Sequence, residues 1–185
     1  MFIQTEDTPN PDTLKFIPGE IVLKTGTVDY ASKEVASNSP LASKLFQIEG
    51  VSRIFLANDF ISVTKDTQFD WNILKPSILT GIMEHYSSGL PAVNLVVDKN
   101  FEVNNTEDTE TIKQIKDLLE TRVRPAVAMD GGDIIFCSFE SGVVTLQMQG
   151  ACAGCPSSTA TLKMGIENML RHYIPEVREV RAAEL

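Results

Sequence analysis

The chain has 185 residues, of which 43% are hydrophobic and 22% are charged, the ordinary balance of a globular protein. Its 16 basic and 25 acidic residues give a formal net charge of −9. The first hundred residues and the remainder are both acidic, so neither has the basic surplus that binding to a phosphate backbone needs. No apolar run approaches the roughly 20 residues of a membrane-spanning helix. We therefore expect neither a nucleic-acid partner nor a membrane partner.

The first hundred residues predict short strands and two helices. The helix at 71–86 is the better marked, because Asp70 can cap its start and Gly89 follows its end. Pro76 lies inside this stretch, so the helix is either kinked there or begins later. The other elements expected here are strands at 14–22, 51–56 and 60–63 and a helix at 32–46. The apolar spacing of the 71–86 helix predicts a buried face made of Ile73, Leu74, Ile78, Ile82 and His85.

A polar run at 98–108 predicts a linker, after which a second set of elements follows. Its first helix, at 107–124, has Thr106 as its cap and Pro125 at its end. The run from Asp130 to Asp133 predicts a turn. Strands at 134–139, 143–149 and 177–180 and a helix at 158–173 complete the chain. We expect an α+β fold of two small domains, 1–100 and 105–185, each with a short β-sheet packed by helices.

Two of the three cysteines, Cys152 and Cys155, form a Cys-x-x-Cys pair between a strand and a helix. An odd number of cysteines argues against a disulfide framework and indicates a reducing compartment. A helix N-terminus lowers the pKa of a nearby thiol, and two intervening residues allow both thiolates to bind one metal. Gly150 and Gly154 let the loop bend, and Pro156 suits the first helical position. The small neighbouring side chains predict an exposed loop.

The pair alone is compatible with a zinc site, an iron–sulfur site or the dithiol centre of a thioredoxin-like oxidoreductase. Zinc and iron–sulfur sites usually need four ligands, and this loop supplies two. We expect Cys137 to be a buried apolar side chain on its strand. His172 lies too far along its helix to share the site, and His85 belongs to the other domain. The two remaining thiolates are then expected from a second copy of the chain in a two-fold dimer.

The loop is part of a longer pattern. Asp130-Gly131-Gly132-Asp133, the hairpin after it, Gly150-Ala151-Cys152-Ala153-Gly154-Cys155-Pro156-Ser157-Ser158 and Ile174-Pro175-Glu176-Val177 resemble the NifU C-terminal domain. Thr8-Pro9-Asn10-Pro11-Asp12-Thr13-Leu14-Lys15-Phe16 and Gly50-Val51-Ser52-Arg53-Ile54-Phe55 are similar to the N-terminal domain of Nfu proteins. Together the two resemblances cover nearly the whole chain in the order of the family.

This resemblance implies an Nfu-type iron–sulfur scaffold or carrier, which is not an enzyme. It assigns Cys152 and Cys155 as the ligands of a [4Fe–4S] cluster held between two subunits, with [2Fe–2S] as the alternative form. The implied partners are upstream cluster assembly proteins and the apo-proteins that receive the cluster. We expect the cysteine-free N-terminal domain to serve docking or specificity, or alternatively only folding and dimerisation. The implied location is a bacterial cytoplasm or, for a processed eukaryotic protein, the mitochondrial matrix.

Overall fold

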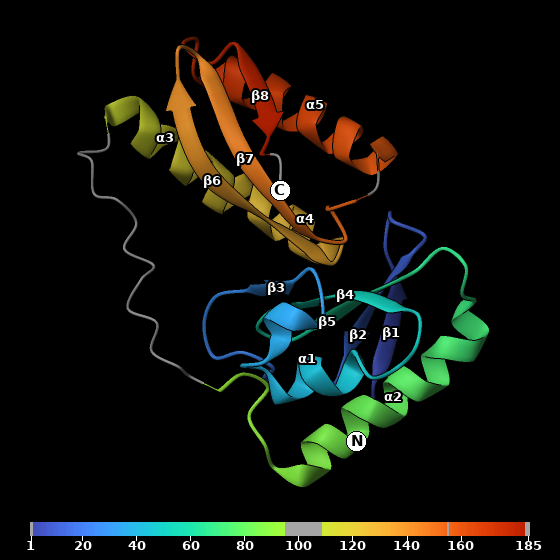
Figure 1. The fold of residues 1–185 in the computed structure, drawn as a ribbon. Helices are drawn as coiled ribbons and strands as arrows, with labels where there is room; N and C mark the ends of the chain where they lie inside the picture. The colour runs from blue at the N-terminus through green and yellow to red at the C-terminus, as the bar shows by residue number, and fades with distance from the viewer. Residues whose placement is uncertain (1, 95–108, 155, 184–185) are drawn as a thin grey trace. The chain divides into compact units, whose positions relative to one another are not determined.

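A computed structural model describes residues 2–94, 109–154 and 156–183. The chain divides into two compact units, Met1–Asp98 and Lys99–Leu185, and each has its own sheet and helices (Figure 1). The predicted α+β class is confirmed. None of the helices in the described ranges is both long and apolar enough to cross a membrane.

The N-terminal unit is built on a five-stranded antiparallel sheet with the order β1-β2-β5-β4-β3. The prediction captured the three inner strands and missed the two edge strands, β1 and β3. Those two segments, Gln-Thr-Glu-Asp and Val-Asp-Tyr, are too short and too polar to show an apolar alternation. The strands are β1 (Gln4–Asp7), β2 (Thr13–Ile17), β3 (Val28–Tyr30), β4 (Val51–Leu56) and β5 (Ile61–Lys65).

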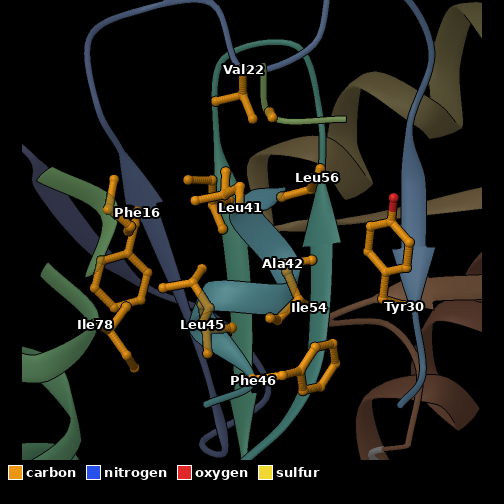
Figure 2. Packing of buried hydrophobic residues seen from close by; sticks show 14 of the residues in the cluster. Phe16, Val22, Tyr30, Leu41, Ala42, Leu45, Phe46, Ile54, Leu56 and Ile78 are labelled. Atoms are coloured by element: carbon orange, nitrogen blue, oxygen red, sulfur yellow. The ribbon is translucent and has the colours of Figure 1, made fainter. Parts of the chain in front are cut away.

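Two helices, α1 (Pro40–Leu45) and α2 (Trp71–Ser88), share one apolar core with this sheet. Figure 2 shows Leu41 and Leu45 of α1 and Ile78 of α2 among the side chains of the strands. Helix α2 begins at the predicted cap, where the Asp70 side chain accepts a hydrogen bond from the N–H of Asn72. Pro76 lies inside α2, and Ile73, expected on its buried face, is 70% exposed.

The single helix predicted at 32–46 is wrong. The segment forms a short 3-10 helix, η1 (Glu34–Ala36), followed by α1. Ser39 separates them as the N-cap of α1, since its hydroxyl accepts a hydrogen bond from the N–H of Ala42. Pro40 lies in the first turn of α1, where a missing N–H costs nothing, whereas inside a longer helix it would break a backbone hydrogen bond.

The C-terminal unit has a three-stranded sheet in the order β6-β7-β8. Strands β6 (Gly132–Glu140) and β7 (Val143–Gly150) form an antiparallel hairpin, and β8 (Glu179–Ala182) runs parallel to β7. The helical elements are α3 (Glu110–Leu118), the π-helical turn η2 (Leu119–Val123), α4 (Arg124–Met129) and α5 (Pro156–Tyr173). They share one core with the strands, which contains Ile115 of α3, Val127 of α4, Leu146 of β7 and Leu170 of α5.

Two expectations about the helix before this sheet are corrected. The predicted cap, Thr106, lies outside the described residues, and α3 is capped by Thr109, whose hydroxyl accepts from the N–H of Ile112. Pro125 does not end the helical segment but lies in the first turn of α4. The wider π-helical turn η2 interrupts the regular backbone ladder just before it, so the missing N–H of the proline falls at a helix start.

Candidate metal centre

The Cys-x-x-Cys loop connects the end of β7 at Gly150 with the start of α5 at Pro156. Gly150 and Gly154 have φ angles of 61° and 81°, a region that favours glycine, so the predicted bend of the loop is confirmed. Cys152 lies within this bend. Cys155, the second predicted ligand, lies outside the described residues.

Cys152 is buried, and this corrects the expectation of an exposed loop at this residue. Its side chain is 7% exposed and belongs to the core of the C-terminal unit. Ala151 and Ala153 on either side are also buried, whereas Gly154 is exposed. Small side chains do not by themselves indicate exposure, because they also allow a loop to pack closely against the strands below it.

The Asp130–Asp133 turn lies directly against the cysteine loop. A β-carbon on Gly132 would stand 2.6 Å from Sγ of Cys152 and 2.7 Å from the carbonyl oxygen of Gln149. The N–H of Ala151 donates to the carbonyl of Gly131 over 3.1 Å, which ties the loop to the turn. The sequence pattern predicts only a turn at these glycines. The adjacent pair before a strand was the available signal of a close backbone approach.

Further contacts fix the backbone of Cys152. Its N–H donates to the carbonyl of Gln149 over 3.3 Å, and its carbonyl accepts from the hydroxyl of Thr159 in α5 over 2.9 Å. The loop is thus held from β7 on one side and from α5 on the other. Gln149 is buried, and its side-chain oxygen Oε1 has no hydrogen-bond partner among the described residues.

The electrostatic environment of Cys152 is opposite to the expected one. Burial, reinforced by the nearby carboxylates of Asp130 and Asp133, raises the pKa of the thiol to about 12. The predicted lowering of the pKa by the helix N-terminus is therefore wrong for this residue. Desolvation disfavours the charged thiolate, and two negative neighbours disfavour it further. The thiol is protonated at neutral pH, so a metal that binds Cys152 must displace its proton.

Asp133 is itself held by an ion pair. Nε and Nη2 of Arg124 donate to its two carboxylate oxygens over 2.9 and 2.8 Å, and Nη1 donates to Glu120 over 2.6 Å. The N–H of Ile134 donates to the same carboxylate over 2.8 Å. The hydrogen bonds that Arg124 donates, chiefly to Asp133 and then to Glu120, raise the pKa of its guanidinium, which stays charged. The resulting network joins the turn to α4.

The other candidate side chains lie elsewhere. Cys137 was expected to be buried and is exposed, because it lies on the same side of β6 as Ile135, which is also exposed, whereas Ile134 on the opposite side is buried. His85 is buried in α2 of the N-terminal unit, where burial lowers its pKa. Within the described ranges, no three His, Cys, Asp or Glu side chains gather as metal ligands.

Comparisons with known proteins cover both units. A family model described as the N-terminal domain of the scaffold protein Nfu/NifU matches residues 3–89, and a NifU-like domain model matches residues 115–181. The solution NMR structure of a NifU-like protein from Saccharomyces cerevisiae covers 50% of this chain and 84% of its own, with 25% identity and a TM-score of 0.46.

Full-length relatives match along almost the entire chain. The human protein named NFU1 iron-sulfur cluster scaffold homolog, mitochondrial, is 54% identical over 97% of this chain and 71% of its own length. NifU-like protein 4, mitochondrial, of Arabidopsis thaliana is 51% identical over 97% of this chain and 65% of its own length. The chain belongs to the Nfu/NifU-like family of scaffold proteins.

Proposed function

We propose that this chain is an iron–sulfur cluster scaffold or carrier that is not an enzyme. It holds a [4Fe–4S] cluster between two copies through Cys152 and Cys155 and releases it to apo-proteins. The names of its relatives support the class of cargo. The observation that carries the proposal is the position of Cys152, on a loop bent at two glycines immediately before a helix. Thiolates are the ligands that iron–sulfur clusters use.

The number of ligands requires the second copy. A [4Fe–4S] cluster is usually held by four thiolates, and the Cys-x-x-Cys loop supplies two per chain. Cys137 does not fill the gap within one chain, because it lies five residues along β6 from Gly132, the residue that contacts Cys152. A dimer formed around the cluster completes the set, so the binding energy of the cluster becomes association energy.

The buried thiol suits a carrier that cycles between empty and loaded forms. The pKa of Cys152 is about 12, so its thiol keeps its proton in the empty chain. The same side chain packs in the core of the C-terminal unit. Loading exchanges this proton for iron, and transfer to a recipient returns it. The loop contributes two thiolates per chain, and a recipient with its own thiolates can replace them one by one.

The two alternative functions, a dithiol oxidoreductase and a structural zinc dimer, need different chemistry at the cysteine pair. A dithiol oxidoreductase needs a first cysteine with a lowered pKa, because the thiolate is the nucleophile. Cys152, the first of the pair, has a raised pKa, which disfavours this alternative. A reduced sample that fails to reduce insulin disulfides would agree with the scaffold. Zinc in place of iron in freshly purified protein would instead support a structural zinc dimer.

We assign the N-terminal domain to docking of partner proteins, both the assembly proteins that deliver the cluster and the recipients. It contains no cysteine, so it cannot supply thiolates. The mitochondrial names of the relatives favour the mitochondrial matrix as the place of action. Transfer from the full chain and from the isolated C-terminal unit to the same apo-protein would measure the contribution of the N-terminal domain.

Anaerobic reconstitution with iron and sulfide tests the central proposal. We expect a chain that is monomeric when empty and dimeric when loaded, with about two iron atoms per chain, half of a four-iron cluster. About one iron per chain would indicate the [2Fe–2S] form instead. Sedimentation together with iron and sulfide analysis gives both quantities. A loaded monomer that contains about four iron atoms would contradict the bridged site.

A further inference from the structure

The Arg124–Asp133 ion pair connects α4 with the start of β6. Two nitrogens of one guanidinium meet two oxygens of one carboxylate over 2.9 and 2.8 Å, which is the bidentate arrangement. The side chain of Asp133 is 5% exposed and that of Arg124 is 35% exposed. A buried carboxylate depends on its partner, because without it the charge stays desolvated and uncompensated.

This ion pair fixes the turn that lies against the cysteine loop. Asp133 follows Gly132, whose α-carbon packs against the Cys152 thiol, and it pairs with Gln149 across the β6–β7 ladder. Gly131, at the other side of Gly132, accepts the hydrogen bond from Ala151. A shift of Asp133 would therefore move the surface on which Cys152 rests.

We propose that Arg124 is a positioning residue for Cys152, acting through Asp133 and the Gly131–Gly132 turn. The inference rests on the proposed function only for what Cys152 binds. The packing of the thiol against the turn is a property of the empty chain. Arg124 also pairs its positive charge with Asp133, so it limits the negative charge that would face an anionic cluster at the loop.

Alkylation of the empty chain tests the positioning without any cluster. Alkylation is assigned to each cysteine by fragmenting the peptides in the mass spectrometer, since Cys152 and Cys155 lie on one peptide, and the reaction is run under conditions where the chain is folded. In the unmodified chain we expect slow alkylation of Cys152 and fast alkylation of Cys137, which is exposed. In Arg124→Met the rate at Cys152 should rise about tenfold or more, since charge-assisted hydrogen bonds to the buried carboxylate are lost. The rate at Cys137 should stay unchanged.

Two control variants separate positioning from general loss of stability. Arg171→Met makes the same substitution at an exposed arginine whose pair with Glu167 spans 3.6 Å, and it should leave the rate at Cys152 unchanged. Val144→Ala opens the core of the same unit on β7 without touching the turn. Denaturant is added until each variant has the same free energy of unfolding. A rate at Cys152 in Arg124→Met no higher than in Val144→Ala would overturn the proposal.

The loaded form gives a second, independent readout. Arg124→Met should bind iron and sulfide yet show an altered visible circular dichroism spectrum and lose iron to a chelator several times faster than the unmodified chain. Arg124→Lys, which keeps the charge, should restore part of the lifetime. Spectra and lifetimes equal to those of the unmodified chain would overturn the inference. Failure of the unmodified chain to bind any cluster would refute the proposed function, while the alkylation result would still decide the role of Arg124.

Discussion

Gly132 and Cys152 are in direct contact across the cysteine loop, and only a residue without a side chain fits at position 132. A β-carbon there would stand 2.6 Å from the thiol sulfur and 2.7 Å from the carbonyl oxygen of Gln149. The sulfur could move aside, but the carbonyl belongs to the backbone of β7 and cannot. The glycine therefore determines how deeply the Cys152 side chain is buried in the core.

Gly132→Ala should destabilise the empty chain and expose the Cys152 thiol. We expect a loss of about 1–3 kcal/mol in the free energy of unfolding, the usual cost of inserting volume into a packed site. Denaturant titration measures this loss. Gly165→Ala is the matched control, because this exposed position in α5 has no atom within 4 Å of an added β-carbon. The control should be neutral or slightly stabilising, since alanine favours a helix over glycine. Equal stability of the two variants would show that the turn can yield.

The structure describes two cysteines of the C-terminal unit, and their replacement by serine should have very different effects. Cys152→Ser places a hydroxyl in the core and removes a ligand, so it should cost about 1–3 kcal/mol of stability and abolish cluster binding. Cys137→Ser, at an exposed position, should change stability by less than about 0.5 kcal/mol and leave the cluster intact. Thermal unfolding and iron analysis of both variants check the pair. Loss of the cluster in Cys137→Ser would return that residue to the ligand set.

The sequence predicted the order of helices and strands around the loop because glycine and proline residues mark the ends of these elements clearly. The Cys-x-x-Cys spacing and flanking glycines located the candidate site, and Pro156 starts α5 as expected. The depth of Cys152 could not be predicted, since it depends on a contact with Gly132, twenty positions earlier in the chain. The glycine pair indicates a close backbone approach, but local spacing does not say which residue it will contact.

Tertiary context also reversed the roles of Cys137 and Pro125. Strand alternation placed Cys137 on one face with Ile135, and the two do share a face, but it is the exposed face of β6. Pro125 was expected to end its helix, and a π-helical turn lets the helical segment continue. A π-turn changes the helical period by one residue, and alternation along a strand does not say which of its two faces is buried, so neither outcome follows from the local sequence.

Because the pKa of Cys152 is raised, the free energy of unfolding of the empty chain should vary with pH in the alkaline range. In the folded chain the thiol keeps its proton up to about pH 12, whereas in the unfolded chain it loses it near 9.0. Its contribution is complete below the unfolded pKa and is lost as pH rises towards the folded pKa, because the folded state binds more protons. The slope approaches about 1.4 kcal/mol per pH unit.

Tyr86, whose pKa is raised to about 12 by burial, contributes in the same direction, so Cys152→Ala is the required control. The free energy of unfolding of the unmodified chain minus that of the variant should fall between about pH 8 and 10. A difference that stays constant over this range would contradict a buried, protonated thiol.

The last prediction is that a fragment from residue 105 to the C-terminus folds alone and binds the cluster. The two apolar cores have no residue in common, and the C-terminal one joins α3, α4, α5 and all three strands of its sheet. A cut at 105 keeps Thr109, the residue that caps α3. The fragment should therefore unfold cooperatively, and it should take up as much iron per chain as the full protein does.

Transfer of the cluster should distinguish the fragment from the full chain. If the N-terminal domain docks partner proteins, the fragment should give up its cluster to a chelator at the normal rate but to an apo-protein more slowly. Equal transfer rates would refute the docking role while leaving the site intact. An unfolded fragment would show instead that the C-terminal unit needs the N-terminal one for its stability, and the division at the polar run would then be wrong.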